Sequence, residues 1–296
     1  MNLEAYLHNR SSLVDQALDR WLPAENLLPP SLHQAMRYSV FAGGKRLRPI
    51  LLFAASEAVG GTAQQVMHAA CAMEMIHTYS LVHDDLPAMD DDDFRRGRPT
   101  NHKVYGEATA ILAGDALLTE AFRLLADAEA NSSISPETVL RVIEIVARYA
   151  GSQGMVGGQI VDMESEGKEI DFPTLEYIHT RKTGGLILAA VQVGALLGGG
   201  NEKQFAALTR FGGAAGLAFQ IADDILDVVG DQDELGKDVG SDQARGKATY
   251  PSLLGISEAR ERADELCHIA VEALTPLGAA AETLQLLAHY IIDRNS

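Results

Sequence analysis

Helical periodicity runs from one end of the chain to the other, whereas strand signals are almost absent. Apolar residues recur at helical spacing, and no stretch alternates apolar and polar residues or joins β-branched runs by a hairpin dipeptide. Ala63–Asp85 is apolar nearly all round, which indicates a central helix rather than a surface helix. No linker, repeat or low-complexity segment divides residues 1–296. The pattern therefore predicts an all-α fold, a single-domain bundle of roughly ten or more helices.

Prolines mark where several of these helices begin. Pro29 and Pro30 separate the first helical stretch from the second. Pro49 occupies a first-turn position, as do Pro136 and Pro173 in two later helices. After the N-terminal stretch, the pattern predicts helices over residues 32–42, 50–59, 63–85, 107–129, 136–150, 152–164, 173–198, 202–229, 257–273 and 278–293.

Composition narrows the class of protein without identifying it. Hydrophobic residues make up 47% and charged residues 22%, a globular mixture that excludes a disordered or fibrous chain. The chain carries 24 Lys+Arg against 41 Asp+Glu, a net charge of −17, which argues against nucleic acid as the main partner. Cys71 and Cys267 are too few for a disulfide framework and fit a reduced, cytoplasmic setting.

No segment has the features of an export signal or a membrane span. The N-terminus carries Glu4 and has no apolar core of signal-peptide length. The best candidate for a span, Gly184–Gly200, contains Gln192 and is shorter than the roughly 20 apolar residues needed. We expect this segment to be a buried helix, and the protein to be soluble and to have no membrane partner.

Two acidic clusters close two of the apolar helices. The first runs from His83 to Asp93 and the second from Gln220 to Asp227. Asp223 and Asp227 are four residues apart and share a helix face, where their like charges need to be neutralised. A divalent cation with oxygen ligands does this, and Mg²⁺ leaves its remaining positions to water and substrate phosphates.

The first cluster is expected to form a loop at the end of the central helix. Asp84 and Asp90 are six residues apart with Pro87 between them, so the chain must loop out and return Asp90. An isolated run of aspartates is more often a solvated loop. Two such runs at helix ends, one with Arg95 close behind, instead favour carboxylate–Mg²⁺ sites beside an arginine fork, an arrangement that holds a diphosphate.

Basic side chains gather in further motifs. Gly43–Pro49, with the sequence GGKRLRP, places three cations on a turn before a helix start, which suits an anion. Lys182 lies at the mouth of the most apolar helix, and Lys237 follows the second acidic cluster. His77 lies two turns before Asp84 on the central helix. These parts together describe a central apolar cavity with carboxylates and cations at its rim, suited to a diphosphate head and a hydrocarbon tail.

In these motifs the sequence resembles the trans-isoprenyl diphosphate synthases over nearly its whole length. The spacing of Asp85 and Asp90 is most similar to that of bacterial farnesyl diphosphate synthases and plant-type geranylgeranyl enzymes. The resemblance implies an isoprenoid-synthase fold, a homodimer, and head-to-tail condensation of isopentenyl diphosphate with dimethylallyl and geranyl diphosphate to farnesyl diphosphate. The motifs that match are GGKRLRP, Asp84–Asp90 with Arg95-Arg96, Gly157-Gly158-Gln159 with Asp162, Lys182-Thr183, and Gln220–Asp227.

The resemblance also assigns roles to individual residues. About three Mg²⁺ ions would be bound by Asp84, Asp85, Asp90, Asp223 and Asp227. The allylic diphosphate would be held by Arg95, Lys182, Lys237 and Lys247. Isopentenyl diphosphate would be held by Lys45, Arg48, His77 and Arg96. The residues expected to act in ionisation, condensation and proton loss are Arg95, Lys182, Thr183 and Gln220.

The residues just before Asp84 are expected to determine product length. With the allylic head held near Asp84, the growing tail runs back along the central helix, where Tyr79 lies about 7–8 Å deeper at 1.5 Å per residue. A phenol ring there closes the pocket, with the small Ser80 beside it. By family resemblance, an aromatic residue at this position is typical of short-chain synthases, so farnesyl diphosphate is the expected product.

Three other functions stay open. A geranylgeranyl diphosphate synthase performs the same chemistry with a deeper pocket. A class I terpene cyclase would carry an Asn/Ser/Glu metal site where this chain has Asp223–Asp227, and would have no use for Lys45 and Arg48. A non-catalytic partner of a prenyl synthase would lack one acidic motif, and here both are intact.

Overall fold

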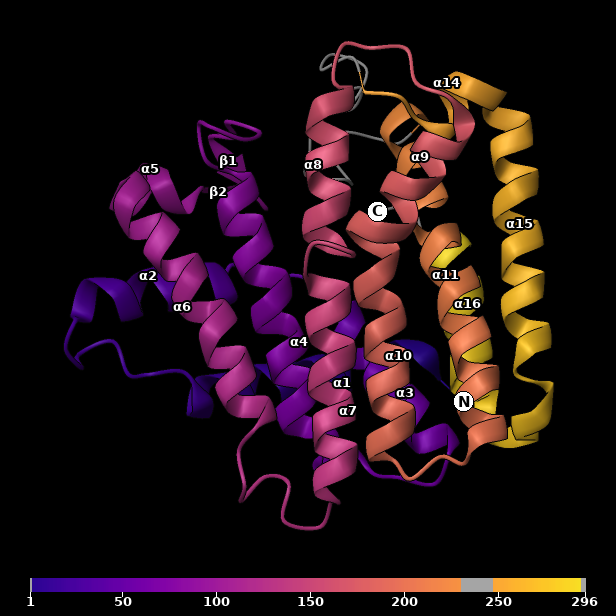
Figure 1. The fold of residues 1–296 in the computed structure, drawn as a ribbon, viewed down its shortest axis with the longest axis horizontal. Helices are drawn as coiled ribbons and strands as arrows, with labels where there is room; N and C mark the ends of the chain where they lie inside the picture. The colour runs from indigo at the N-terminus through magenta and orange to yellow at the C-terminus, as the bar shows by residue number, and fades with distance from the viewer. Residues whose placement is uncertain (1, 230–246, 294–296) are drawn as a thin grey trace.

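Long helices form almost the whole molecule, which confirms the predicted all-α class (Figure 1). The computed structural model describes residues 2–229 and 247–293. Its α-helices are α1 (Leu3–Trp21), α2 (Pro30–Val40), α3 (Leu47–Ala58), α4 (Ala63–Asp84), α5 (Asn101–Tyr105), α6 (Glu107–Leu125), α7 (Pro136–Ala150), α8 (Met155–Ser165), α9 (Phe172–Ile178), α10 (Gly185–Leu197), α11 (Glu202–Val229), α14 (Tyr250–Leu254), α15 (Ile256–Ala273) and α16 (Glu282–Asp293). A π-helix spans His179–Gly184 and a 3₁₀ helix spans Thr275–Ala281, and the short strands are β1 (Phe94–Arg95) and β2 (Arg98–Pro99).

Most of these helices have the expected boundaries. α7 and α11 coincide with their predicted ranges, whereas α6 ends at Leu125 rather than at residue 129. The stretch predicted as one helix over 173–198 is helical throughout, but its turns widen to a π-helix between α9 and α10. The short helix α14 was not predicted, although Thr249 and Ser252 form a capping box at its start.

The hairpin β1–β2 was also not expected from the sequence. Arg95 pairs with Arg98 across it, and the two turn residues, Arg96 and Gly97, both have positive φ, 53° and 72°. Two left-handed residues match the twist of a two-residue hairpin. Arginine is uncommon at the first of these positions, so the dipeptide gave no turn signal.

Two apolar clusters fill the bundle. One surrounds α4, where Met73 and Ile76 are fully buried, and this confirms the central position predicted for that helix. The other joins α3 and α10 to α11, α15 and α16 around Phe211. The predicted buried helix within Gly184–Gly200 is α10. Among the described helices, none combines the length and apolar character that a membrane span requires.

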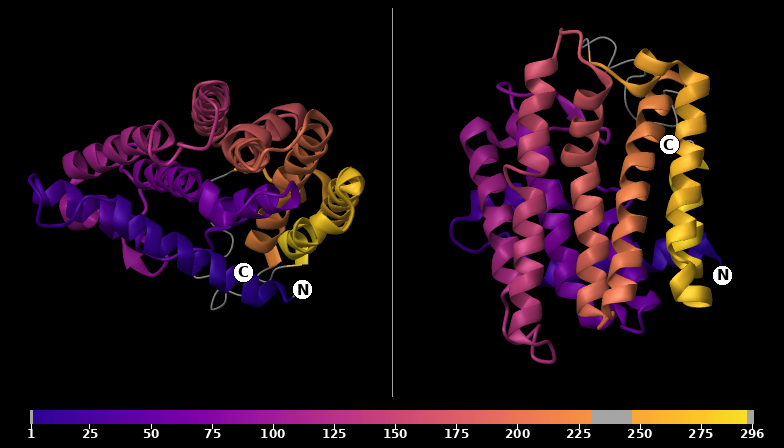
Figure 2. Two further views of the ribbon diagram at one scale, coloured as in Figure 1. Left: turned by 90° about the horizontal axis from the view of Figure 1, so that it is seen from below. Right: turned by 45° about the vertical axis from the view of Figure 1, so that its right-hand side comes forward.

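The arrangement brings both acidic motifs to one end of the bundle. α1 and α2 run along one side of the roughly antiparallel long helices (Figure 2). The last turns of α4 and α11 lie at the same end as the hairpin β1–β2 and the start of α9 (Figure 1). Residues separated by more than 100 positions therefore share one end of the molecule.

Candidate active site

The first acidic motif is a loop that closes on the end of α4, as predicted. The N–H of Asp90 donates to the carbonyl of Asp84 at 2.8 Å, and the N–H of Asp91 donates to the carbonyl of Leu86 at 3.1 Å. Burial raises the pKa of Asp84 to about 6, and repulsion from Asp90 adds to this rise. The positive charge of Lys182 acts in the opposite direction. The loop thus holds Asp84 and Asp90 side by side at the helix end.

Asp85 is placed differently from Asp84. Its carboxylate is buried and accepts from Nε and Nη2 of Arg95 at 2.7 and 2.6 Å. Arg95 also lies 3.6 Å from Asp92. Asp85, predicted as a metal ligand, and Arg95, predicted as a diphosphate ligand, therefore pair with each other. The pair fixes the hairpin that carries Arg95 to the end of α4.

Two lysines converge on Asp162 of α8. Lys182 Nζ lies 2.6 Å from its carboxylate, and Lys247 Nζ lies 3.6 Å from it. Lys247 is also 3.7 Å from Asp90 and 3.8 Å from Glu166. Burial alone would raise the pKa of Asp162, but the two lysines lower it. This network connects the first acidic motif to the π-helix. Asp162 belongs to a motif that resembles the family, but no role was predicted for it from the sequence.

The Gly157-Gly158-Gln159 motif explains how Lys182 reaches Asp162. A Cβ on Gly158 would lie 2.3 Å from the backbone nitrogen of Lys182, so only glycine lets the π-helix lie directly on α8. Gln159 is three residues before Asp162 on the same helix face. Both polar atoms of its amide are buried and have no hydrogen-bond partner among the residues that the structure describes. A buried unpaired amide is costly, which points to a ligand or water at this position.

The second acidic motif contains two kinds of aspartate. Asp223 and Asp227 are half-buried one turn apart on α11. Asp224 is buried and accepts hydrogen bonds from His179 Nε2 at 2.7 Å, Gln220 Nε2 at 3.1 Å and the Tyr250 N–H at 2.9 Å. Asp224 therefore ties the π-helix and α14 to α11.

Sequence reasoning missed Asp224 and His179. The available signal was that Asp224 follows Ile221 by three residues and so lies on the buried face of its helix. Gln220 was predicted to act in the reaction, and the structure shows its amide donating a hydrogen bond to Asp224. Thr183 is half-buried within the π-helix.

The basic turn before α3 lies against the hairpin β1–β2. The Arg96 guanidinium donates to the carbonyl of Gly43. A Cβ on Gly44, whose φ is +128°, would lie 2.6 Å from that guanidinium, so glycine is needed for this approach. Lys45 is exposed on the same turn. The structure therefore brings together the cations of two motifs more than 40 residues apart in sequence.

Arg48 and His77 face this basic group from α3 and α4. Burial lowers the pKa of Arg48 to about 10, against the attraction of Glu74 and Asp223. Its Nε is buried and has no hydrogen-bond partner within residues 2–229 and 247–293. Burial is the main reason that the pKa of His77 lies well below its usual range, and repulsion from Arg48 and Arg96 adds to this effect. The imidazole of His77 is therefore neutral at pH 7. Because the charge of Asp223 acts on Arg48, the second acidic motif lies near the basic group.

The remaining predicted residues are distributed as follows. Tyr79 is buried, with its ring edge-on to that of His83 at a centroid distance of 5.7 Å. Ser80 donates to the carbonyl of His77 at 2.9 Å. Lys237 lies outside the described residues.

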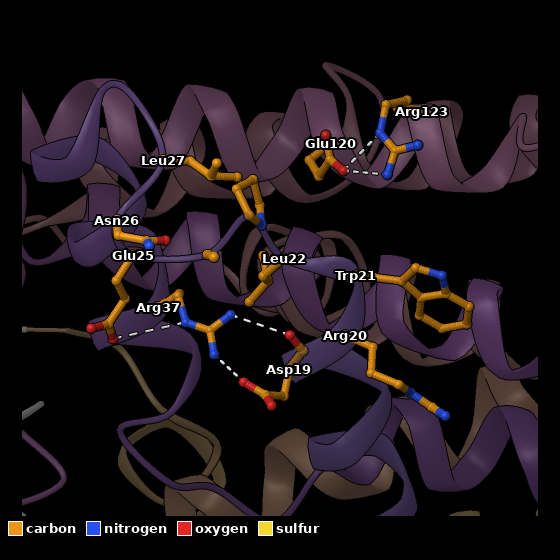
Figure 3. Close-up of a pocket in the computed structure, with 12 residues that line it drawn as sticks. Asp19, Arg20, Trp21, Leu22, Glu25, Asn26, Leu27, Arg37, Glu120 and Arg123 are labelled. Atoms are coloured by element: carbon orange, nitrogen blue, oxygen red, sulfur yellow. Dashed lines mark hydrogen bonds and ion pairs between the residues drawn. The ribbon is translucent and has the colours of Figure 1, made fainter.

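A separate pocket of about 890 Å³ lies away from these motifs (Figure 3). It lies between the end of α1, the following loop and α6. Two of its arginines are paired with carboxylates: Arg37 with Asp19, and Arg123 with Glu120 at 2.5 Å. None of the predicted site residues lines it. The predicted central apolar cavity therefore stays a prediction.

The carboxylates fit a cation that is completed by a substrate. Within the described ranges, no group of three or more Asp, Glu, His or Cys side chains is placed to hold a metal ion. Four of the five aspartates predicted as ligands are half-buried, Asp84 and Asp90 in the first motif and Asp223 and Asp227 in the second. Mg²⁺ commonly binds one or two carboxylates together with substrate phosphates and water, so the donor chemistry suits that ion.

Fold and site together define a helical enzyme for diphosphate esters, and comparison with known proteins identifies the family. The polyprenyl synthetase family model matches residues 29–284, and the chain belongs to this family. It is 51% identical over 263 residues to the farnesyl diphosphate synthase of Geobacillus stearothermophilus, covering 88% of each chain. It is 46% identical over 296 residues to the geranylgeranyl diphosphate synthase of Cyanophora paradoxa, covering 100% of this chain and 97% of the relative.

Solved structures agree with this assignment. The crystal structure of an FPP/GFPP synthase from Zymomonas mobilis has a TM-score of 0.88 at 36% identity, covering 98% of this chain and 99% of that one. The chain is therefore a prenyltransferase, a short-chain prenyl diphosphate synthase of isoprenoid biosynthesis.

The two adjacent aspartates of the second motif should differ in their effect on stability. Asp224→Ala leaves His179 Nε2 and the Tyr250 N–H without their partner, and we expect it to lower the free energy of unfolding by about 3 kcal/mol. The matched variant Asp223→Ala removes a half-buried like charge and should change it by less than about 1 kcal/mol. Urea unfolding of both variants measures this, and equal losses would contradict the tying role of Asp224.

Proposed function

We propose that this enzyme condenses isopentenyl diphosphate head to tail with dimethylallyl and geranyl diphosphate, and that farnesyl diphosphate is its main product. One observation carries the proposal. At a single end of the bundle, Lys247 lies between Asp90 and Asp162, while Asp162 holds Lys182. Acidic and basic side chains are thus gathered at one place, an arrangement that suits a diphosphate and its metal ions.

The allylic diphosphate is assigned to the side of the site with Asp84 and Asp90. Asp84, Asp90 and Asp223 would hold about three Mg²⁺ ions, with Asp85 and Asp227 in support. Bound Mg²⁺ supplies positive charge where the leaving diphosphate becomes more negative. The cations assigned to the same diphosphate are Arg95, Lys182 and Lys247, with Lys237 added by family resemblance.

Isopentenyl diphosphate is assigned to the basic group formed by Lys45, Arg48 and Arg96. These cations bind a diphosphate without a metal ion. The neutral His77 offers a hydrogen bond there without adding a further charge. The two substrates thus approach from opposite sides of the site.

Condensation requires that the allylic cation meets only the isopentenyl double bond. Ionisation breaks the bond between the allylic carbon and the diphosphate, and Lys182 neutralises charge on the departing group. The double bond of isopentenyl diphosphate then attacks the cation, and loss of a proton restores neutrality. Thr183 and Gln220 are the polar groups assigned beside the cation, and the departed diphosphate is the proposed proton acceptor.

Product length is assigned to Tyr79. Its ring is fixed against His83, whose Nε2 lies 3.0 Å from the carbonyl oxygen of Ile111 on α6. A Cβ on Gly114 would lie 2.2 Å from that Nε2, so a glycine makes room for the imidazole. A buried ring held between α4 and α6 is a fixed obstruction rather than a mobile side chain. This supports a C15 product over the C20 product named for other relatives.

We further propose that the enzyme works in the cytoplasm as a homodimer. The exposed apolar side chains of Ile111 and Leu112 on α6 support a contact with a second copy.

Activity should depend on Mg²⁺ and on both acidic motifs. Asp84→Ala and Asp223→Ala should each lower turnover at least about 100-fold. Each variant removes a carboxylate proposed to hold Mg²⁺ beside the departing diphosphate. Asp264→Ala, an exposed change on α15, serves as the control and should leave turnover unchanged. Assays with saturating substrates, with Mg²⁺ and after chelation, measure this. Near-normal turnover of either variant would contradict the shared-metal assignment.

Product analysis tests the farnesyl assignment. Wild-type enzyme supplied with isopentenyl and dimethylallyl diphosphate should give the C15 alcohol after dephosphorylation. Tyr79→Ala should shift the product to C20 and beyond at similar total turnover, because removing the ring opens a cavity. Tyr79→Phe keeps the ring and should keep C15. A C20 product from the wild type would overturn the assignment, and an unchanged C15 product from Tyr79→Ala would show that Tyr79 does not limit the chain.

A further inference from the structure

Arg46, in the middle of the GGKRLRP motif, carries its charge into the protein interior. Its side chain is 2% exposed, and Nη1 lies 2.7 Å from the carboxylate of Glu74, which is also 2% exposed. Nε lies 2.9 Å from Asp15, and Nη2 donates to the carbonyl of Val40 at 2.6 Å. One guanidinium therefore joins the basic turn to α1, α2 and α4.

The backbone at Arg46 directs its side chain inward. Its φ and ψ are 52° and 34°, in the left-handed region, which is unfavourable for a residue with a side chain. Such a conformation persists only where the surroundings hold it. Its neighbours differ from it in environment: Lys45 is exposed, and Arg48 is half-buried in the first turn of α3.

Glu74 is electrostatically coupled to the cations proposed for isopentenyl diphosphate. It lies on α4 three residues before His77, and its charge acts on both Arg48 and Arg96, favouring their charged forms against the effect of burial. In the described part of the chain, Arg48 Nε is buried and has no hydrogen-bond partner. A carboxylate freed beside such a donor gains a charge-assisted hydrogen bond by turning to it.

We propose that Arg46 is a positioning residue that occupies the Glu74 carboxylate and so keeps Arg48 and Arg96 available to an incoming diphosphate. The proposal deepens the proposed function, because it rests on the assignment of isopentenyl diphosphate to this basic group. Removing one member of a buried ion pair leaves an uncompensated charge that must find another partner. Without Arg46, Glu74 pairs with Arg48 and competes with the substrate.

Binding of isopentenyl diphosphate alone, titrated by calorimetry with a chelator present, tests this without catalysis. Arg46→Met should weaken binding by about tenfold or more. Glu74→Gln should bind at least as tightly as the wild type, because the competing charge is gone. The double variant Arg46→Met with Glu74→Gln should recover affinity to within about threefold. A merely structural role for Arg46 predicts no such recovery.

A matched control separates this effect from general loss of packing. Arg10 and Glu57 form another partly buried pair, at 2.6 Å between α1 and α3. Arg10→Met should lower the melting temperature without changing the affinity for isopentenyl diphosphate. Equal affinity in Arg46→Met and wild type, or equal weakness in Arg46→Met and the double variant, would overturn the proposal.

Two further results keep the test decisive. If Arg46→Met does not fold, Glu74→Gln alone decides: retained or tighter binding supports the proposal, and binding weakened about tenfold overturns it. Prenyl transfer by the wild type is measured separately. If the wild type binds isopentenyl diphosphate but forms no product, the proposed function fails, while the recovery in the double variant still supports the role of Arg46.

Discussion

The site depends on keeping opposite charges close together without letting them cancel. At one end of the bundle, at least five acidic or basic motifs meet, and most of their charged groups are at least half-buried. In such surroundings, a carboxylate that has no specific partner pairs with the nearest cation. The structure resolves this by giving certain charges fixed internal partners: Asp85 to Arg95, Glu74 to Arg46, and Asp162 to Lys182.

Neighbouring residues within one motif differ in their surroundings. In the first acidic motif, Asp85 is paired with Arg95 of the hairpin, whereas Asp84 lies half-buried at the helix end, under the influence of Lys182 and Asp90. In the second, Asp224 fastens the π-helix, whereas Asp223 acts on Arg48 from across the site. Adjacent aspartates point to different sides of a helix because successive residues are about 100° apart. Consecutive aspartates in one motif therefore occupy different structural environments.

The sequence predicted the helices and the loop at Asp90 well because both follow from local rules. Apolar periodicity marks buried faces, and Pro87 prevents the helix from continuing. Long-range pairs could not be predicted in this way. The contact of Gly158 with the Lys182 backbone and the bond of His179 to Asp224 each depend on how helices pack, which no local pattern records. The π-helix was missed because nothing in the local pattern of His179–Gly184 distinguishes it from an α-helix, and the close contact of Gly158 with the Lys182 backbone depends on packing.

The central claim is that the site holds two diphosphates by different means, one with metal ions and one with protein cations alone. Calorimetry of the wild-type enzyme tests it most directly, using isopentenyl diphosphate and a non-ionising thio analogue of geranyl diphosphate. The account predicts that isopentenyl diphosphate binds in the presence of a chelator, whereas the allylic analogue binds only with Mg²⁺. If both ligands required Mg²⁺, or neither did, the division of the site into two diphosphate positions would be contradicted.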